Sequence, residues 1–204
     1  MVNTTPKPIQ LALVVLCFLP FNELFGQKTQ LQESDWAIKL EFSYLLGVGS
    51  LDYEGFAVNN STNVYSLRTS VSKRIRDSST YLGMGIGLDG YHNPTYNTMP
   101  LFIEAVSLHK FRQINFEINL KGGYSIGAIR DVKPGWFSEI ALGFILLNKK
   151  KRKLVLSPTY KVQQIKNANI LIFYFDPMNN VISTEYVEDT IHAHNLGLKL
   201  SWYF

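Results

Sequence analysis

The chain of 204 residues contains little cysteine, little charge and no long apolar run. Its single cysteine is Cys17, so no intramolecular disulfide bond stabilises the fold. Charged residues make up 18% of the sequence, against about 25% in soluble globular domains. No stretch approaches the roughly 18 consecutive apolar residues that a transmembrane helix needs, which excludes a helical membrane protein.

The composition also excludes a disordered chain and gives no support to nucleic-acid binding. Apolar residues make up 46% and aromatic residues 13% of the sequence, which is enough to form a packed core. The net charge is +4, and the cations are scattered rather than gathered in a continuous stripe, so we expect no nucleic-acid partner. The length predicts a single domain.

The N-terminal segment has the features of a secretory signal peptide. Lys7 precedes an eleven-residue apolar stretch, Leu11–Phe21, which suits a signal peptide and is too short to cross a membrane. A buried N-terminal helix or strand is the alternative, and a lipoprotein signal at Cys17 is disfavoured because the residue before it is bulky. We predict a signal peptide cleaved before Gln27, and we divide the chain into signal peptide (1–26), N-terminal lead (27–35) and barrel domain (36–204).

From residue 36 to residue 204 the polarity of the sequence alternates with a period of two, which is typical of strands rather than helices. The fourth segment is ambiguous because both of its rows are largely apolar. Glu104 lies in one of them, so we assign the other row, that of Leu101 and Ile103, to the apolar side. Each segment is close to the 9–11 residues that a tilted strand needs to cross a bilayer. The eight predicted strands are 36–44, 65–72, 82–88, 101–108, 114–121, 136–144, 154–162 and 196–204.

The connections between these strands alternate in length, as in transmembrane barrels with tight turns at one rim and long loops at the other. In the last connection, apolar runs at 170–175 and 181–183 flank a turn and predict a hairpin that extends the barrel. The short connections are 74–79, 110–113 and 148–152, and the long ones are 45–63, 89–98, 127–134 and 165–192.

The more polar row of each strand collects glycines and charges. Adjacent glycines weaken a solvent-facing strand, but inside a narrow barrel they leave room for long neighbouring side chains. Four carboxylates face five cations, a near balance that a confined interior requires because an unpaired buried charge costs several kcal/mol. We predict a lumen charge network of Lys39, Glu41, Arg68, Glu104, Glu117, Lys121, Glu139, Lys161 and Lys199.

The apolar rows carry almost no charge, as contact with lipid demands, because a cation at the bilayer midplane costs about 2–4 kcal/mol. Aromatic residues fall near the ends of the segments, where amphipathic rings favour the membrane interface. They are Trp36, Tyr65, Trp136, Tyr160 and Trp202. The alternative is a soluble exported barrel that holds an apolar ligand and carries the charges of the polar row on its surface.

The strand count, the loop asymmetry, the glycines of 83–87 and the terminal Phe204 resemble the small outer-membrane β-barrel family, the OmpA/OmpX-like group of Gram-negative bacteria. The resemblance implies an all-β fold, an eight-stranded antiparallel up-and-down transmembrane barrel. It also implies insertion by the outer-membrane assembly machinery, which recognises a C-terminal aromatic strand. Leu200, Trp202 and Phe204 match that insertion signal. Because the chain ends with the barrel, we expect no peptidoglycan-binding domain.

Candidate catalytic groups are few. His192 and His194 are two residues apart, but no carboxylate or cysteine joins them at a recognisable metal-ligand spacing. Residues 183–185 (Ser-Thr-Glu) supply side chains that lipid-modifying barrels use, although no motif fixes their geometry. The glycines of 83–87 lie within a strand and are not a nucleotide-binding loop. We therefore assign no catalytic, cofactor-binding or metal-binding residue and expect no cofactor.

Two basic runs, Lys149–Lys153 and Lys73–Arg76, fall in predicted short turns. They are either solvated turns or sites that contact anionic headgroups at the periplasmic rim. We expect a monomeric, exported outer-membrane barrel of structural or interaction type, with a closed polar lumen. Its outer loops would contact lipopolysaccharide, surfaces or partner proteins. The alternatives are a lipid-modifying enzyme (a lipid A deacylase or acyltransferase), a soluble ligand-binding barrel and a small channel.

Overall fold

The structure, a computed structural model, describes residues 35–53, 56–76, 78–92, 95–112, 114–127, 133–149, 152–175 and 181–204. The predicted signal peptide and all of the lead except Asp35 lie outside these residues. The strands are β1 (Trp36–Gly47), β2 (Ser50–Tyr53), β3 (Phe56–Asn59), β4 (Asn63–Arg74), β5 (Thr80–His92), β6 (Tyr96–Phe111), β7 (Ile114–Gly127), β8 (Lys133–Lys149), β9 (Arg152–Phe175) and β10 (Val181–Tyr203). Within these described ranges no helix is long and apolar enough to span a membrane.

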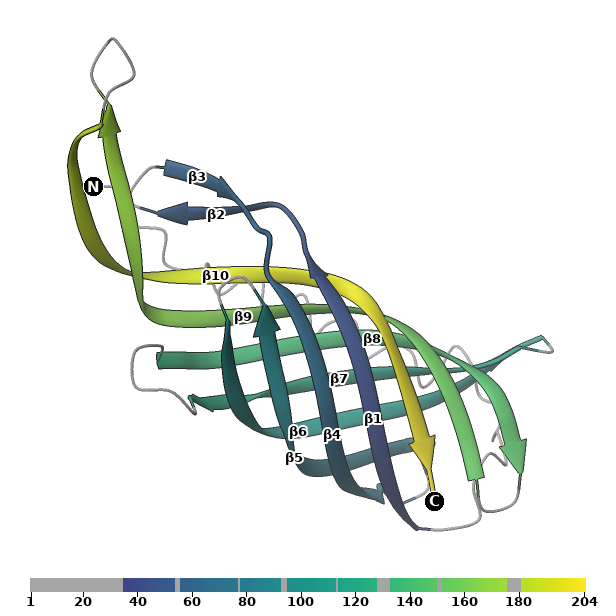
Figure 1. Ribbon diagram of the computed structural model, residues 1–204. Helices are drawn as coiled ribbons and strands as arrows, with labels where there is room; N and C mark the ends of the chain where they lie inside the picture. Colours follow the sequence, from purple (N-terminus) through teal and green to yellow (C-terminus); the bar gives the residue numbers. More distant parts are fainter. Residues whose placement is uncertain are drawn as a thin grey trace.

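Eight of the strands close into a barrel, in the order β1-β10-β9-β8-β7-β6-β5-β4, and all neighbours are antiparallel. The remaining two, β2 and β3, pair with each other outside the barrel (Figure 1). Each barrel strand contains one of the eight segments predicted from the alternation, except that β10 ends at Tyr203, one residue before the predicted end. The predicted eight-stranded antiparallel up-and-down fold is therefore confirmed.

The two ends of the barrel differ in their connections. β4–β5, β6–β7 and β8–β9 join through short connections at one end, which also holds the start of β1 and the C-terminus (Figure 1). We call this the short-turn end and the opposite end the long-loop end. The β2–β3 hairpin and the extended parts of β9 and β10 lie at the long-loop end.

Two of the predicted connections differ in detail from the structure. The segment 89–98 is mostly strand rather than a long loop, because Asp89 and Tyr91 continue the inward row of β5 and Tyr91 pairs with Tyr96. The segment 45–63 contains the β2–β3 hairpin. The hairpin predicted within 165–192 is confirmed, since β9 and β10 remain paired as far as Phe175 and Val181.

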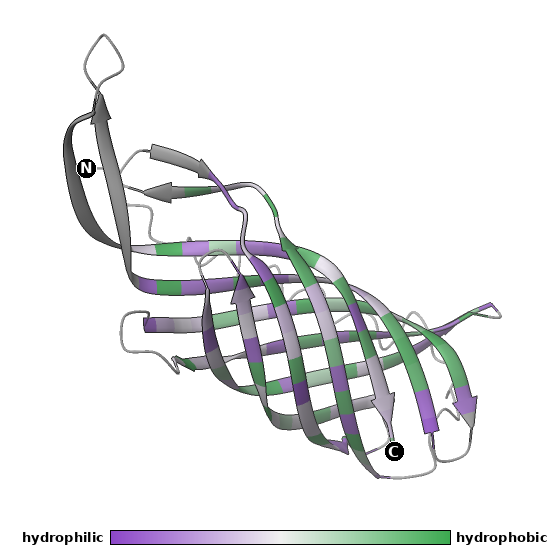
Figure 2. Cartoon of the chain, viewed as in Figure 1, coloured by the Kyte–Doolittle hydropathy of each residue, from purple (hydrophilic) through white to green (hydrophobic). Residues whose placement is uncertain are grey.

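Alternate side chains of the barrel strands point to opposite sides of the wall, so hydrophobic and hydrophilic positions alternate along each strand (Figure 2). In β6, Leu101 and Ile103 are exposed while Phe102 and Glu104 are buried, which confirms the facing predicted from Glu104. Exposed charged side chains of the described strands occur only near the two ends of the barrel.

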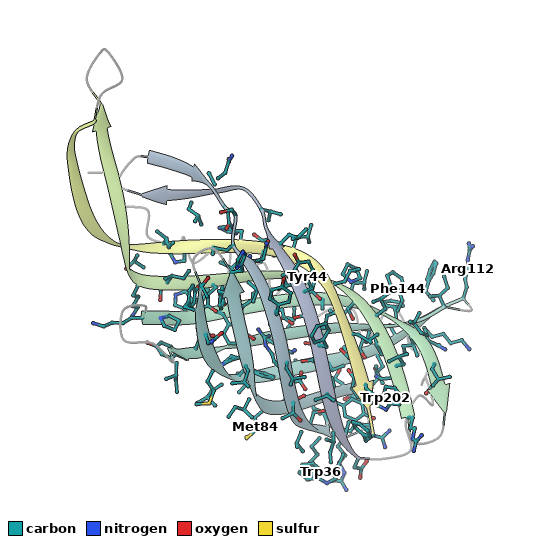
Figure 3. The ribbon with its side chains drawn as sticks, in the orientation of Figure 1. Trp36, Tyr44, Met84, Arg112, Phe144 and Trp202 are labelled. Atoms are coloured by element: carbon teal, nitrogen blue, oxygen red, sulfur yellow. The ribbon has the colours of Figure 1, made fainter. Side chains whose placement is uncertain are left out.

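The exposed apolar row has a height suited to a bilayer. In β1 this row runs from Trp36 to Leu46, ten residues apart. Such a separation corresponds to about 33 Å along the strand and about 25 Å along the axis of a barrel with the usual tilt. The apolar band of outer-membrane barrels is about 25 Å tall. Met84 and Phe144, which are labelled in Figure 3, are exposed on the outside of this wall.

Glycines in the inward rows leave space for larger neighbours. A Cβ atom added to Gly85 would collide with the ring of Phe102, and one added to Gly87 would collide with the side chain of Arg68. Two adjacent glycines of β7 provide a contrast. A Cβ at Gly123 would meet the Leu101 carbonyl and Phe102, whereas a Cβ at Gly122 would meet no atom within 4 Å.

We predict that Gly123→Ala lowers the free energy of unfolding by about 1–3 kcal/mol, because the added methyl group overpacks the wall. The matched variant Gly122→Ala should unfold within about 0.5 kcal/mol of the wild type. Urea titration of the refolded barrel, followed by tryptophan fluorescence, measures both values. Equal stability of the two variants would contradict this account of the glycines.

Candidate functional site

The interior of the barrel holds a buried ion network to which all eight barrel strands contribute. The nine residues proposed from the sequence all lie on this inner face, and each is at most 4% exposed. The structure adds two more buried charges, Asp89 and Lys153. Among the described residues, six cations therefore share the interior with five carboxylates. The cations are Lys39, Arg68, Lys121, Lys153, Lys161 and Lys199, and the carboxylates are Glu41, Asp89, Glu104, Glu117 and Glu139.

Two glutamates form the centre of the network. Glu41 on β1 forms ion pairs with Lys121, with Lys39 at 3.1 Å and with Lys199 at 3.5 Å. Glu139 on β8 pairs with Arg68 at 2.6 Å, Lys199 at 2.9 Å and Lys121 at 3.4 Å. Lys121 and Lys199 thus bridge the two glutamates. Each glutamate compensates three cations, which makes the centre sensitive to the loss of either one.

Toward the long-loop end the network continues through Asp89. The guanidinium of Arg68 donates two hydrogen bonds to this carboxylate, at 3.0 and 2.7 Å, a bidentate geometry. The Lys161 ammonium lies 2.7 Å from the same carboxylate and donates a hydrogen bond to the Tyr91 hydroxyl at 2.7 Å. That hydroxyl donates in turn to the Gln163 side chain at 3.1 Å.

Toward the short-turn end two carboxylates face inward. Glu104 forms an ion pair with Lys39 at 2.5 Å and accepts a hydrogen bond from the Ser70 hydroxyl at 2.7 Å. Glu117 pairs with Lys153 at 2.9 Å and accepts hydrogen bonds from the Tyr203 hydroxyl. The Lys153 ammonium also lies 3.6 Å from the centre of the Tyr203 ring, a cation–π contact.

Apolar clusters flank the ion network at both ends of the barrel. At the long-loop end Tyr91 and Tyr96 stack with ring centres 4.2 Å apart, within the buried cluster of Leu45, Leu51, Val64, Tyr91, Tyr96, Ile165, Ile191 and Ala193. At the short-turn end Ala37, Tyr81, Val106, Leu108, Val155 and Tyr203 form a second cluster. The charges therefore lie in a low-dielectric compartment, where ion pairing is strong and an unpaired charge is costly.

Both additional charges continue a row that the sequence already displays. Asp89 follows Gly83, Gly85 and Gly87 in the inward phase of β5, but it falls outside the predicted strand, which ends at residue 88. Lys153 lies in phase with the inward residues of β9, so it belongs to this strand and not to the basic turn predicted from the sequence. Continuing the alternation by one residue after residue 88, and by one residue before residue 154, places Asp89 and Lys153 in the inward rows.

The histidine pair lies on the outer wall near the long-loop end. The His192 ring is 5.5 Å from Trp136, and the His194 Nδ1 atom is 2.6 Å from the Tyr160 hydroxyl. The side chains of residues 183–185 lie outside the described part of the structure. Among the residues that are described, no group of three or more metal-ligating side chains occurs.

The residues of the predicted insertion signal are exposed on the outward face of β10 and at Phe204, which directly follows this strand. Leu200, Trp202 and Phe204 are 42%, 39% and 57% exposed. The rings of Trp202 and Phe204 stack at 6.2 Å, and the backbone N–H of Phe204 donates a hydrogen bond to the Ile38 carbonyl at 3.0 Å. The last residue is thus held against β1, where the barrel closes.

The strand order and the filled interior define the class of this protein as a small, closed eight-stranded antiparallel β-barrel with a polar core. It has the fold that its resemblance to the OmpA/OmpX-like group implies. No family model and no curated protein matches the sequence.

Solved structures similar to this chain include the following two. Neisserial surface protein A (NspA) has 7% sequence identity and a TM-score of 0.48, with 82% of this chain and 96% of that chain covered. The outer membrane protein OprG from Pseudomonas aeruginosa has 10% identity and a TM-score of 0.42, with 85% and 99% covered.

We predict that Glu139→Gln lowers the free energy of unfolding by about 3–5 kcal/mol, because it leaves a buried cation without full compensation. The double variant Glu139→Gln/Lys199→Gln removes one charge of each sign and should recover part of that loss. Asp35→Asn is the control, since the exposed pair of Asp35 with Arg74 is worth less than about 1 kcal/mol. Urea titration measures all three, and equal effects of the Glu139 and Asp35 variants would disprove the role of the network.

Proposed function

We propose that this chain is an integral outer-membrane β-barrel of structural and interaction type, surrounded by membrane lipid and lipopolysaccharide. The observation that carries the proposal is the distribution of polarity across the wall. Eleven charged side chains are buried inside, while residues such as Met84 and Ile103 are 71% and 70% exposed on the outside. A soluble barrel that carries an apolar ligand requires the reverse, with the apolar face inside.

The aromatic residues of the outer wall support placement in a bilayer. Trp36, Trp202 and Phe204 lie near the short-turn end, and Trp136 and Tyr160 lie nearer the long-loop end. Amphipathic rings at both edges of an apolar band are the pattern of a barrel that meets two membrane–water interfaces. The outward histidines lie beside Trp136 and Tyr160, which suits an interfacial position.

The long-loop end supplies the surfaces for interaction in this proposal. The β2–β3 hairpin and the extensions of β9 and β10 project beyond the barrel at this end (Figure 1). Paired strands that continue past the membrane present backbone edges and loops to partners. The filled interior suits a display role better than conduction, since ion pairs and the rings of Phe102 and Phe137 occupy it.

We expect Leu142→Lys to destabilise the barrel in phosphatidylcholine vesicles by about 2–4 kcal/mol, because this exposed residue lies midway along β8. Leu146→Lys is the matched control, as it belongs to the same outward row near the short-turn end and should cost at most about 1 kcal/mol. In a soluble barrel both substitutions would be neutral. Urea titration measures stability, and membrane fractionation with a heat-modifiability gel tests residence and barrel closure.

We also propose that a signal peptide over 1–26 directs export and that Leu200, Trp202 and Phe204 are read by the assembly machinery. Phe204→Ala should then reduce the amount of heat-modifiable barrel in outer membranes several-fold while leaving refolding into detergent unchanged. Phe111→Ala, which removes a similarly exposed ring at the same end, is the control. Equal loss in both variants would contradict a specific insertion signal.

A further inference from the structure

The charged residues outside the barrel are distributed unevenly between its two ends. By sequence, the start of β1 and the connections and strand ends of the short-turn end contain nine cations and two carboxylates. Those of the long-loop end contain three cations and seven carboxylates. The cations of the short-turn end are Lys73, Arg74, Arg76, Lys110, Arg112, Lys149, Lys150, Lys151 and Arg152. The net charge of +4 therefore conceals an excess of positive charge at one end and of negative charge at the other.

The described cations of the short-turn end adjoin the apolar band directly. Lys73 continues the outward row of β4 and pairs across the ladder with Trp36, whose ring centre is 5.3 Å from the lysine ammonium. The guanidinium of Arg112 lies 5.6 Å from the ring of Phe111. Arg112, Trp36 and Trp202 are labelled in Figure 3. Cations beside exposed aromatic rings are placed at the depth of lipid headgroups when the apolar band lies in a bilayer.

Little negative charge is available within the protein to compensate these cations. Asp35 pairs with Arg74 at 3.1 Å. Among the residues that the structure describes, no carboxylate lies within ion-pair distance of Lys73, Lys110 or Arg152. Their charges are therefore available to anions supplied by the surroundings.

The geometry points to phospholipid phosphates as those anions, and we propose that the short-turn end binds anionic phospholipid headgroups of the leaflet that it faces. Acyl chains would lie against the apolar rows while the phosphates meet the cations at the rim, so one lipid satisfies both surfaces at once. By sequence, the connections of the long-loop end are acidic, which disfavours the same lipid. This inference rests on the proposed membrane location and deepens it, because it assigns a lipid class to one end of the barrel.

Brominated lipids test the proposal, because bromine quenches only nearby tryptophans. The barrel carries Trp136→Phe, so that the remaining reporters, Trp36 and Trp202, both lie near the short-turn end. It is refolded at low ionic strength into phosphatidylcholine vesicles that contain brominated phosphatidylglycerol or brominated phosphatidylcholine. We expect brominated phosphatidylglycerol to quench more strongly than brominated phosphatidylcholine. This preference should weaken in 0.5 M salt, because screening reduces the attraction between the cations and the phosphates.

Charge variants in this background locate the site. Lys73→Gln/Arg152→Gln should reduce the preference for phosphatidylglycerol by about fivefold for each charge removed. Lys133→Gln/Lys166→Gln removes the same charge from the long-loop end and should leave the preference unchanged. Absence of a preference in the parent barrel, or equal losses in the two variants, would overturn the inference alone. Absence of quenching by brominated phosphatidylcholine would show that the barrel is not in the bilayer and would overturn the proposed function with it.

Discussion

The structure depends on pairing cations with carboxylates in an interior closed to water. Glu41 and Glu139 each compensate three cations, and Lys121 and Lys199 connect them. A charge in such a compartment is stable only when its partner is in place, because desolvation costs several kcal/mol per ion. An apolar outer wall leaves the interior as the location for charge along the middle of the barrel. The network is thus a requirement of the fold as much as a source of stability.

The packing of the interior follows from the same need to enclose paired charges. Long lysine side chains reach from one strand to carboxylates on another. Glycines on neighbouring strands make room for the Arg68 side chain and for an aromatic ring. Gly87 lies against the Arg68 side chain, and Gly85 lies against the ring of Phe102. The apolar clusters at both ends then separate the charges from solvent. Packing and electrostatics are therefore not independent in this barrel.

The glycines and balanced charges of one row predict which row faces the interior, and the connection lengths predict the up-and-down topology. The alternation of polarity is sufficient to predict the eight strands. It failed where strands end, since a period of two does not indicate how far pairing continues. For this reason the alternation predicts a loop at Asp89 and a turn at Lys153, whereas the structure has both in strands. The sequence also does not predict which cation pairs with which carboxylate. Lys39 meets Glu104 and Arg68 meets Glu139 because of strand tilt and stagger, which set which residues face each other across the lumen.

The seam between β1 and β10 joins the two ends of the barrel sequence, and the charge network crosses it. Glu41 on β1 pairs with Lys199 and accepts a hydrogen bond from Ser201, both on β10. Before this seam forms, the sheet is open and its lysines remain hydrated. Closure therefore dehydrates the ions and completes their pairing in one event. Folding should consequently end in a single cooperative step in which the first and last strands meet, and a chain arrested before that step would retain a wet, titratable inner surface.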